Sequence, residues 1–265
     1  MSHRFDTDTA VWPGSEGGFE TRIDPGWWVV SGPNGGYVAA ILLRALALAV
    51  GDPARAPRSL TVHYTSPPQA GPASIETRVE RTGRSLTTVC GRLLQDGKLR
   101  ALALGAFSTQ REGPEFADAR MPEVLPPERC GAWEKRIEIH DRYEQRWAIG
   151  APPFSGSEHA LAGGWIRLPE PRVVDALAVA AVTDAFPPAV FSRLRDPALA
   201  GGVPTIDLTI HFRSALPALE ARPAGWLLAV FQSRMARGGF VEEDGEIWTR
   251  DGVLIAQSRQ LALLR

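Results

Sequence analysis

The chain has 265 residues, of which 44% are apolar, 22% charged and 8% aromatic, a composition typical of a folded globular protein rather than a disordered or fibrous one. At roughly 150 residues per domain, this length fits one large domain or two small ones. The 29 basic and 30 acidic residues leave a net charge of −1, so no overall positive field would hold a nucleic acid by counterion release. We therefore expect no nucleic-acid partner.

The beginning of the chain carries no targeting pattern. Residues 1–8 are polar and acidic, whereas a signal peptide needs a basic stretch followed by an apolar one. The longest apolar run, 37–50, is interrupted by Arg44 and falls short of the ~18–20 residues that span a bilayer. Cys90 and Cys130 form neither a metal-binding spacing nor a disulfide framework. These patterns indicate a cytoplasmic protein with no membrane segment and no structural metal.

The first half begins with a helix and continues as strands. Residues 36–50 are rich in alanine and leucine, which favour helix. Residues 60–66 alternate between apolar and polar side chains, and 73–82, 86–95 and 99–109 are β-rich segments separated by turns that contain glycine. The pattern predicts one helix followed by an antiparallel meander.

A proline-rich connection follows. Residues 110–131 hold four prolines and five carboxylates but few aliphatic side chains, as expected of a segment between packed units. We predict an N-terminal repeat at 1–112, a linker at 113–130 and a C-terminal repeat at 131–265.

The second half repeats the first. The segment 60–66 (LTVHYTS) is echoed by 208–214 (LTIHFRS), and six of the seven positions are identical or conservative. A helix is expected at 173–186, with strands at 205–213, 225–234, 240–249 and 253–264. The fold class is therefore α+β, built of two helix-plus-antiparallel-sheet repeats in tandem.

Five short motifs along this frame carry a resemblance to a known family. They are Gly35-Gly36 at the first helix start, Thr82-Gly-Arg-Ser85 before a strand, Asp184 late in the second helix, Thr205-Ile-Asp207 at a strand start, and Gln260 in the last strand. In this order the chain resembles the double hotdog acyl-CoA thioesterases of the acyl-CoA thioesterase II type. The resemblance implies a tandem hotdog fold, an acyl-CoA substrate, thioester hydrolysis without a cofactor and a place in fatty acid metabolism.

Asp184 is the leading candidate for chemistry. It lies in an apolar stretch, 181–186, that we expect to be the last turn of a helix. A carboxylate there would be desolvated and would face the negative end of the helix dipole, and both effects raise its pKa. From the residues alone, Asp184 could equally be an exposed aspartate that hydrogen-bonds to the turn that follows it. The resemblance favours catalysis, because the family's catalytic aspartate falls at this position.

Thr205 and Gln260 are less distinctive by themselves. Strict alternation places Thr205 on a polar strand face with Asp207, Thr209 and His211, and Gln260 could equally be a solvated strand residue. The resemblance implies that both join Asp184 in holding one water molecule. Such a trio is physically reasonable, since a carboxylate accepts the water proton while a hydroxyl and an amide orient it.

Gly35, Gly36 and Arg84 are candidate substrate-binding residues. Free N–H groups at a helix start can hold a developing oxyanion, although a plain helix start after a turn explains the two glycines equally well. Arg84 could meet a coenzyme A phosphate, but an arginine beside a turn is more often an ordinary surface residue. His63 and His211 occupy the same repeat position without neighbouring ligands, so we predict a role in the sheet and no metal.

The sequence lacks the motifs of several other classes of enzyme. The sequence contains no Gly-x-Ser-x-Gly elbow, no Gly-x-Gly-x-x-Gly, no phosphate-binding loop and no His-Glu-x-x-His. Enoyl-CoA hydration would need an Asp with a downstream His that is not present at the required spacing. The leading hypothesis is an acyl-CoA hydrolase, and the alternative is an acyl-CoA or acyl-ligand binding protein that does not hydrolyse. Because two-fold association is common among soluble proteins, we also expect a homo-oligomer.

Overall fold

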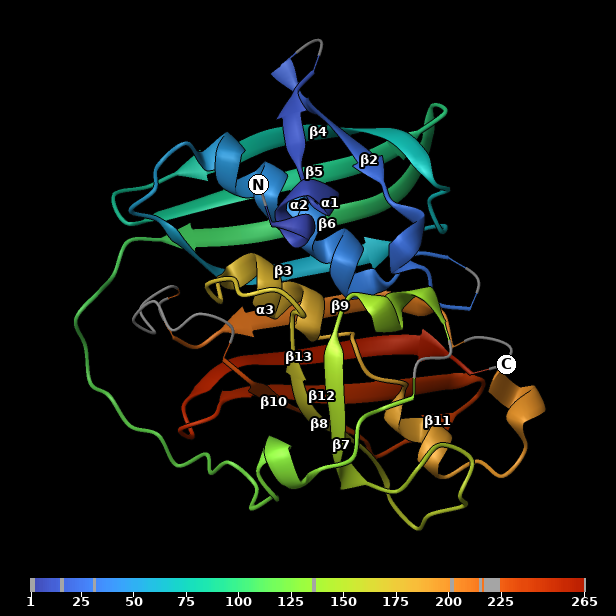
Figure 1. Cartoon of the computed structure of the whole chain (residues 1–265). Helices are drawn as coiled ribbons and strands as arrows, with labels where there is room; N and C mark the ends of the chain where they lie inside the picture. The colour runs from blue at the N-terminus through green and yellow to red at the C-terminus, as the bar shows by residue number, and fades with distance from the viewer. Residues whose placement is uncertain are drawn as a thin grey trace.

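A computed structural model describes residues 3–14, 17–30, 32–134, 137–200, 203–214, 216 and 225–264. Its two halves share one continuous antiparallel sheet, and the two longest helices lie near the middle of the molecule (Figure 1). The N-terminal half is coloured from blue to green in this view, and the C-terminal half from yellow-green through orange to red.

The N-terminal half contains two α-helices, one 3-10 helix and six strands among its described residues. These are α1 (Arg4–Asp8), β1 (Val11–Pro13), β2 (Phe19–Ile23), η2 (Pro25–Trp27), α2 (Gly35–Val50), β3 (Ala56–Tyr64), β4 (Gly71–Thr82), β5 (Leu86–Gln95) and β6 (Lys98–Ser108). The predicted helix and the three predicted β-rich segments of this half are confirmed to within two residues.

The C-terminal half follows the same order of helix and strands. Its elements are η3 (Pro127–Arg129), η4 (Glu138–Asp141), β7 (Glu144–Gly150), β8 (Ala160–Arg167), α3 (Ala176–Val182), η5 (Ala189–Ser192), η6 (Pro197–Ala200), β9 (Thr205–Phe212), β10 (Leu227–Ser233), β11 (Ala236–Arg237), β12 (Phe240–Thr249) and β13 (Leu254–Leu263).

The sheet shows that the chain is an internal duplication. Its strand order is β1-β2-β4-β5-β6-β3-β9-β13-β12-β10-β8-β7, with β11 paired to β12 outside this order. Six strands of one half thus mirror six of the other about the β3–β9 pair. At this centre the hydroxyls of Thr61 and Thr209, equivalent residues of the two repeats, lie 3.0 Å apart. The expected α+β fold of two tandem repeats is confirmed.

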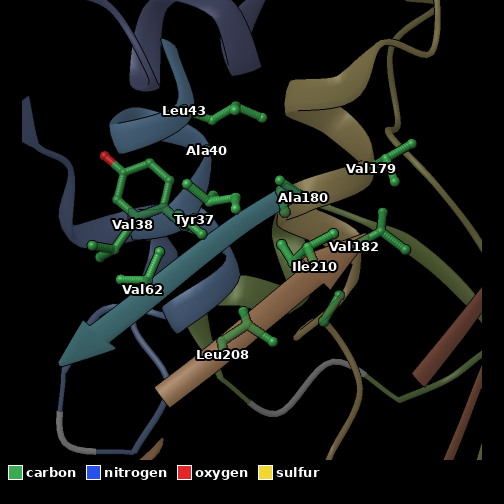
Figure 2. Packing of buried hydrophobic residues seen from close by; sticks show 14 of the residues in the cluster. Tyr37, Val38, Ala40, Leu43, Val62, Val179, Ala180, Val182, Leu208 and Ile210 are labelled. Carbon is green, nitrogen blue, oxygen red and sulfur yellow. The ribbon is translucent and has the colours of Figure 1, made fainter. Parts of the chain in front are cut away.

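The two helices pack against each other over the centre of the sheet. Figure 2 shows Ala40 and Leu43 of α2 close to Ala180 of α3, with Val62 of β3 and Ile210 of β9 beneath them. Gly36 brings the helices this close, since a Cβ there would lie 2.5 Å from the carbonyl oxygen of Ala181. A cluster of buried apolar side chains thus joins both repeats in one core, and the helix end that carries Gly36 is held against the end of α3.

The second helix is shorter than predicted. It spans Ala176–Val182 rather than 173–186. Asp175 accepts a hydrogen bond from the N–H of Ala178 and so fixes the first turn. At the other end the Thr183 hydroxyl donates to the carbonyl of Ala180. Asp184 therefore lies in the turn after α3 and not in its last turn.

The connection between the repeats has no regular structure over residues 109–126, and it runs as the long green segment in Figure 1. We propose the linker at 113–130 on this basis. No helix in the described part of the chain is long and apolar enough to cross a membrane.

Candidate active site

Asp184 lies where the two repeats meet, against the N-terminus of α2. Its Oδ2 accepts hydrogen bonds from the backbone N–H of Gly35 at 2.9 Å and of Gly36 at 3.3 Å. The side-chain amide of Asn34, the N-cap residue of α2, donates to the same oxygen at 2.9 Å. The carboxylate therefore sits at the positive end of the facing helix, which is the opposite of the dipole environment that the sequence suggested.

The electrostatics of Asp184 suit a proton acceptor. Burial raises its pKa to about 6, although hydrogen bonds from Gly36, Gly35 and Gln260 act in the opposite direction. All three donors are neutral, so they stabilise the anion without the strong lowering that an arginine or lysine would cause. A carboxyl group with this pKa is ionised at neutral pH and yet basic enough to take up a proton.

Thr205 and Gln260 meet beside this carboxylate. The Thr205 hydroxyl donates to Oε1 of Gln260 at 2.9 Å, and Gln260 is 7% exposed. The predicted polar face for Thr205 is wrong because β9 and β13 change register between Leu261 and Ala262. This bulge turns Thr205 to the inner face, where it pairs with Ala262, and strict alternation could not anticipate it.

Glu243 is a buried carboxyl of the site that the sequence analysis missed. It lies on β12 directly opposite Gln260 on β13, and its Oε1 accepts a hydrogen bond from Nε2 of Gln260 at 2.8 Å. Burial raises its pKa to about 7. The signal was present in the alternation of β12, because Glu243 occupies the same phase as the buried Val241 and Ile247.

Two tyrosine hydroxyls complete the surroundings. The Tyr64 hydroxyl donates to the carbonyl of Gly35 at 2.8 Å, and the Tyr143 hydroxyl is buried with no hydrogen-bond partner among the described residues. Burial, together with the nearby Asp184 charge, raises the pKa of both phenols well above the usual range. Both therefore stay neutral beside the carboxylate. A cavity of about 240 Å³, lined in part by Trp133, Tyr143 and Gln145, borders this region.

The structure brings Gly35 and Gly36 into the site but leaves Arg84 outside it. The two glycine N–H groups bond the Asp184 carboxylate, and a Cβ on Gly35 would lie 3.0 Å from Asp184 Oδ2. Arg84 precedes β5, whose first residue pairs with Ser108 of β6, and Ser108 in turn pairs with Ala56 at the start of β3. The site lies at the other end of β3, roughly 25 Å of strand away.

His63 and His211 are exposed on the outer face of the sheet, beside the Thr61–Thr209 contact. In the part of the chain that the structure describes, no group of three or more His, Cys, Asp or Glu side chains could hold a metal ion.

Comparison with known proteins places this geometry in a family. The model of the acyl-CoA thioesterase N-terminal domain matches residues 24–109, and that of the C-terminal domain matches residues 116–264. A hotdog-fold protein of unknown function from Alicyclobacillus acidocaldarius superposes with a TM-score of 0.89 at 29% identity, covering 100% of this chain and 99% of its own. A protein from Thermobifida fusca, described as a candidate thioesterase II, gives a TM-score of 0.84 at 28% identity, covering 99% and 97%.

A curated relative points the same way. The thioesterase-like protein TwmA of Talaromyces wortmannii is 23% identical over 93% of this chain and 87% of its own length. Fold and family models together define a thioester hydrolase built on a double hotdog fold. The chain belongs to the acyl-CoA thioesterase family, whose two domain models match most of its length.

Proposed function

We propose that the protein hydrolyses acyl-CoA thioesters with a water molecule held by Asp184, Thr205 and Gln260. The observation that carries the proposal is the half-buried Asp184 carboxylate, which accepts hydrogen bonds from neutral donors among the described residues and whose pKa is raised to about 6. It lies beside the hydroxyl–amide pair of Thr205 and Gln260. These are the three kinds of group that can accept a water proton and orient the remaining lone pair.

The direction of the Thr205–Gln260 hydrogen bond supports one orientation of the proposed water. Because the Thr205 proton is donated to Gln260 Oε1, the Thr205 oxygen is left as an acceptor for one water hydrogen. Asp184 accepts the other. The water oxygen then attacks the thioester carbon as its proton passes to Asp184, and the tetrahedral intermediate expels the coenzyme A sulfur, which takes that proton. The products are a free acid and the coenzyme A thiol.

The start of α2 supplies the remaining electrostatics. The N–H of Gly36 makes the longer of the two backbone bonds to Asp184, 3.3 Å against 2.9 Å for Gly35. We assign it to the thioester oxygen when substrate is bound, since a helix N-terminus stabilises developing negative charge.

The test is thiol release from a panel of short, medium, long and aromatic acyl-CoAs by wild type and Asp184→Asn. Loss of the general base should lower kcat by about 10²- to 10⁴-fold while the melting temperature does not fall, because the amide keeps the size of the carboxyl. The panel also identifies the preferred acyl class. Wild-type turnover by Asp184→Asn, or no thiol release by wild type from any substrate, would contradict the proposal.

We also propose that the protein is a homo-oligomer, as two-fold association is common in soluble proteins. Light scattering tests this directly, and a mass of one chain, 28.7 kDa, would refute it. A cytoplasmic location and a role in fatty acid metabolism stay predictions.

A further inference from the structure

Glu243 is an unusual residue for its place in the fold. It is 7% exposed and lies on the inner face of β12, where its neighbours in phase are Val241, Gly245 and Ile247. No arginine or lysine bonds it among the described residues. A buried carboxyl without a cationic partner lowers the stability of the fold. A role in function would explain why a glutamate occupies this position.

Both oxygens of Glu243 accept a hydrogen bond, one from Gln260 and the other from the segment that follows Asp184. Oε1 accepts from Nε2 of Gln260 at 2.8 Å. Oε2 accepts from the backbone N–H of Ala189 at 2.5 Å, at the start of η5 and five residues after Asp184. Glu243 therefore joins the strand that carries Gln260 to the segment that carries Asp184.

The other repeat shows that the fold does not need a carboxyl at this place. Gln260 pairs with Leu208 and Glu243. The corresponding ladder of the first repeat pairs Gly105 with Leu60 and Val89. Val89, which is fully buried, thus stands where Glu243 stands in the second repeat. The carboxyl occurs only in the repeat that contributes Asp184, Thr205 and Gln260.

We propose that Glu243 is a positioning residue that fixes the amide orientation of Gln260 and, through it, the direction in which the Thr205 hydroxyl points. A carboxylate can only accept hydrogen bonds, so Gln260 must turn Nε2 toward Glu243 and Oε1 toward Thr205. Thr205 must then donate to Oε1, which leaves its oxygen free to accept from water. This inference rests on the proposed function, in which that water attacks the thioester.

Replacing Glu243 by glutamine removes the constraint while keeping the volume. Glutamine can donate as well as accept, so Gln260 can take either orientation. At pH 8, where a carboxyl with a pKa of about 7 is ionised in wild type, we expect Glu243→Gln to lower kcat by up to about 10²-fold with little change in KM. Glu243→Asp keeps the charge and should retain more activity than Glu243→Gln.

The matched control is Glu246→Gln, which removes the same charge from the opposite face of the same strand. We expect it to keep wild-type kcat. Equal losses of kcat in Glu243→Gln and Glu246→Gln would indicate a general charge effect and overturn the proposal.

A double-mutant cycle with Gln260→Ala decides whether Glu243 acts through Gln260. In the Gln260→Ala background, Glu243→Gln should lower kcat no further, because the group that it positions is gone. Multiplicative losses, wild-type kcat in folded Glu243→Gln, or an Asp variant less active than the Gln variant would each overturn the proposal. If Glu243→Gln does not fold, Glu243→Asp enters the same cycle under the same criterion.

The outcome separates this inference from the proposed function. Full activity in Asp184→Asn would refute the proposed function itself. Loss of activity in Asp184→Asn and Gln260→Ala, together with full activity in Glu243→Gln, would refute the role of Glu243 alone.

Discussion

The α2–α3 pair presents a carboxylate to a helix N-terminus at both of its ends, yet the two ends differ in what surrounds that carboxylate. At the start of α2, Asp184 is bonded by two backbone N–H groups and the Asn34 amide, all neutral. At the start of α3, Asp175 caps the helix and is paired with Arg172 at 2.7 Å. The charge of the other partners thus distinguishes the two aspartates: Asp175 is a structural cap, and Asp184 is the base of the proposed reaction.

The ion pairs at the second end extend across the repeats. Arg172 also contacts Asp6 of α1 at 2.8 Å, and Asp6 contacts Arg44 of α2 at 3.0 Å. The hydrogen bond from Arg172 is the largest of the effects that hold the pKa of Asp6 below its usual range. At this end each carboxylate is paired with an arginine. At the other end, burial dominates and raises the pKa of Asp184.

Removing the hydroxyl of Thr205 should have the largest effect of the following changes. Thr205→Val keeps the shape but cannot accept from water, and we expect kcat to fall about 10²-fold. Thr205→Ser keeps the hydroxyl and serves as the control, with activity close to wild type. Equal losses in the two variants would show that shape, not the hydroxyl, matters at this position.

The pH dependence of kcat/KM should report the raised pKa of Asp184. A raised pKa means that the carboxyl stays protonated, and so cannot accept the water proton, up to a higher pH. Activity is therefore expected to be full by about pH 8 and to fall at least tenfold by pH 5, because Asp184, with a pKa of about 6, and Glu243, with a pKa of about 7, are both largely protonated there. A kcat/KM that is constant from pH 5 to pH 8 would contradict this assignment.

The close contact of the helices at the active end predicts a stability effect. Gly36→Ala places a Cβ 2.5 Å from the carbonyl oxygen of Ala181, so α2 and α3 must separate. We expect a loss of about 1–3 kcal/mol in the free energy of unfolding, or roughly 2–4 °C in Tm for each kcal/mol. Gly113→Ala, where a Cβ would meet nothing within 4 Å, is the control and should leave Tm unchanged.

The smallest effect is expected at the opposite end. Arg172→Ala removes a largely buried guanidinium from two partly exposed carboxylates, which should lower stability by about 1–2 kcal/mol, between the values for exposed and buried pairs. Thermal unfolding measures this loss. Unchanged kcat in the same variant would confirm that this end takes no part in catalysis, and a large loss of kcat would contradict the distinction between the ends.

The fold was predictable from sequence because duplication is a pattern of many residues. The echo of 60–66 in 208–214 and the alternation along the strands located the repeats and eight of the strands that follow the two helices. The strands that precede the helices, β1, β2, β7 and β8, and the two-residue β11 were not predicted. Two predictions failed where one local interaction outweighs the pattern. The Asp175 cap shortened the second helix, and a bulge beside Ala262 turned Thr205 inward.

The site was predictable in part. The resemblance named Asp184, Thr205 and Gln260, but the helix-start N–H groups of Gly35 and Gly36 were expected to hold a developing oxyanion. That these groups and Asn34 bond the Asp184 carboxylate itself, 150 positions from Asn34, was not predicted. Glu243 was recoverable in principle. The side chains in phase with it on β12 are apolar, and its equivalent in the first repeat is Val89. A comparison of the two halves position by position would therefore have shown it.

The most direct test of the account is a single turnover of an acyl-CoA in ¹⁸O-labelled water with enzyme in excess. If Asp184 activates water, the free acid of the first turnover carries one ¹⁸O atom and Asp184 carries none. An unlabelled acid in the first turnover, with ¹⁸O recovered in the peptide that contains Asp184, would mean that the carboxylate itself attacks the thioester, and would contradict the central claim.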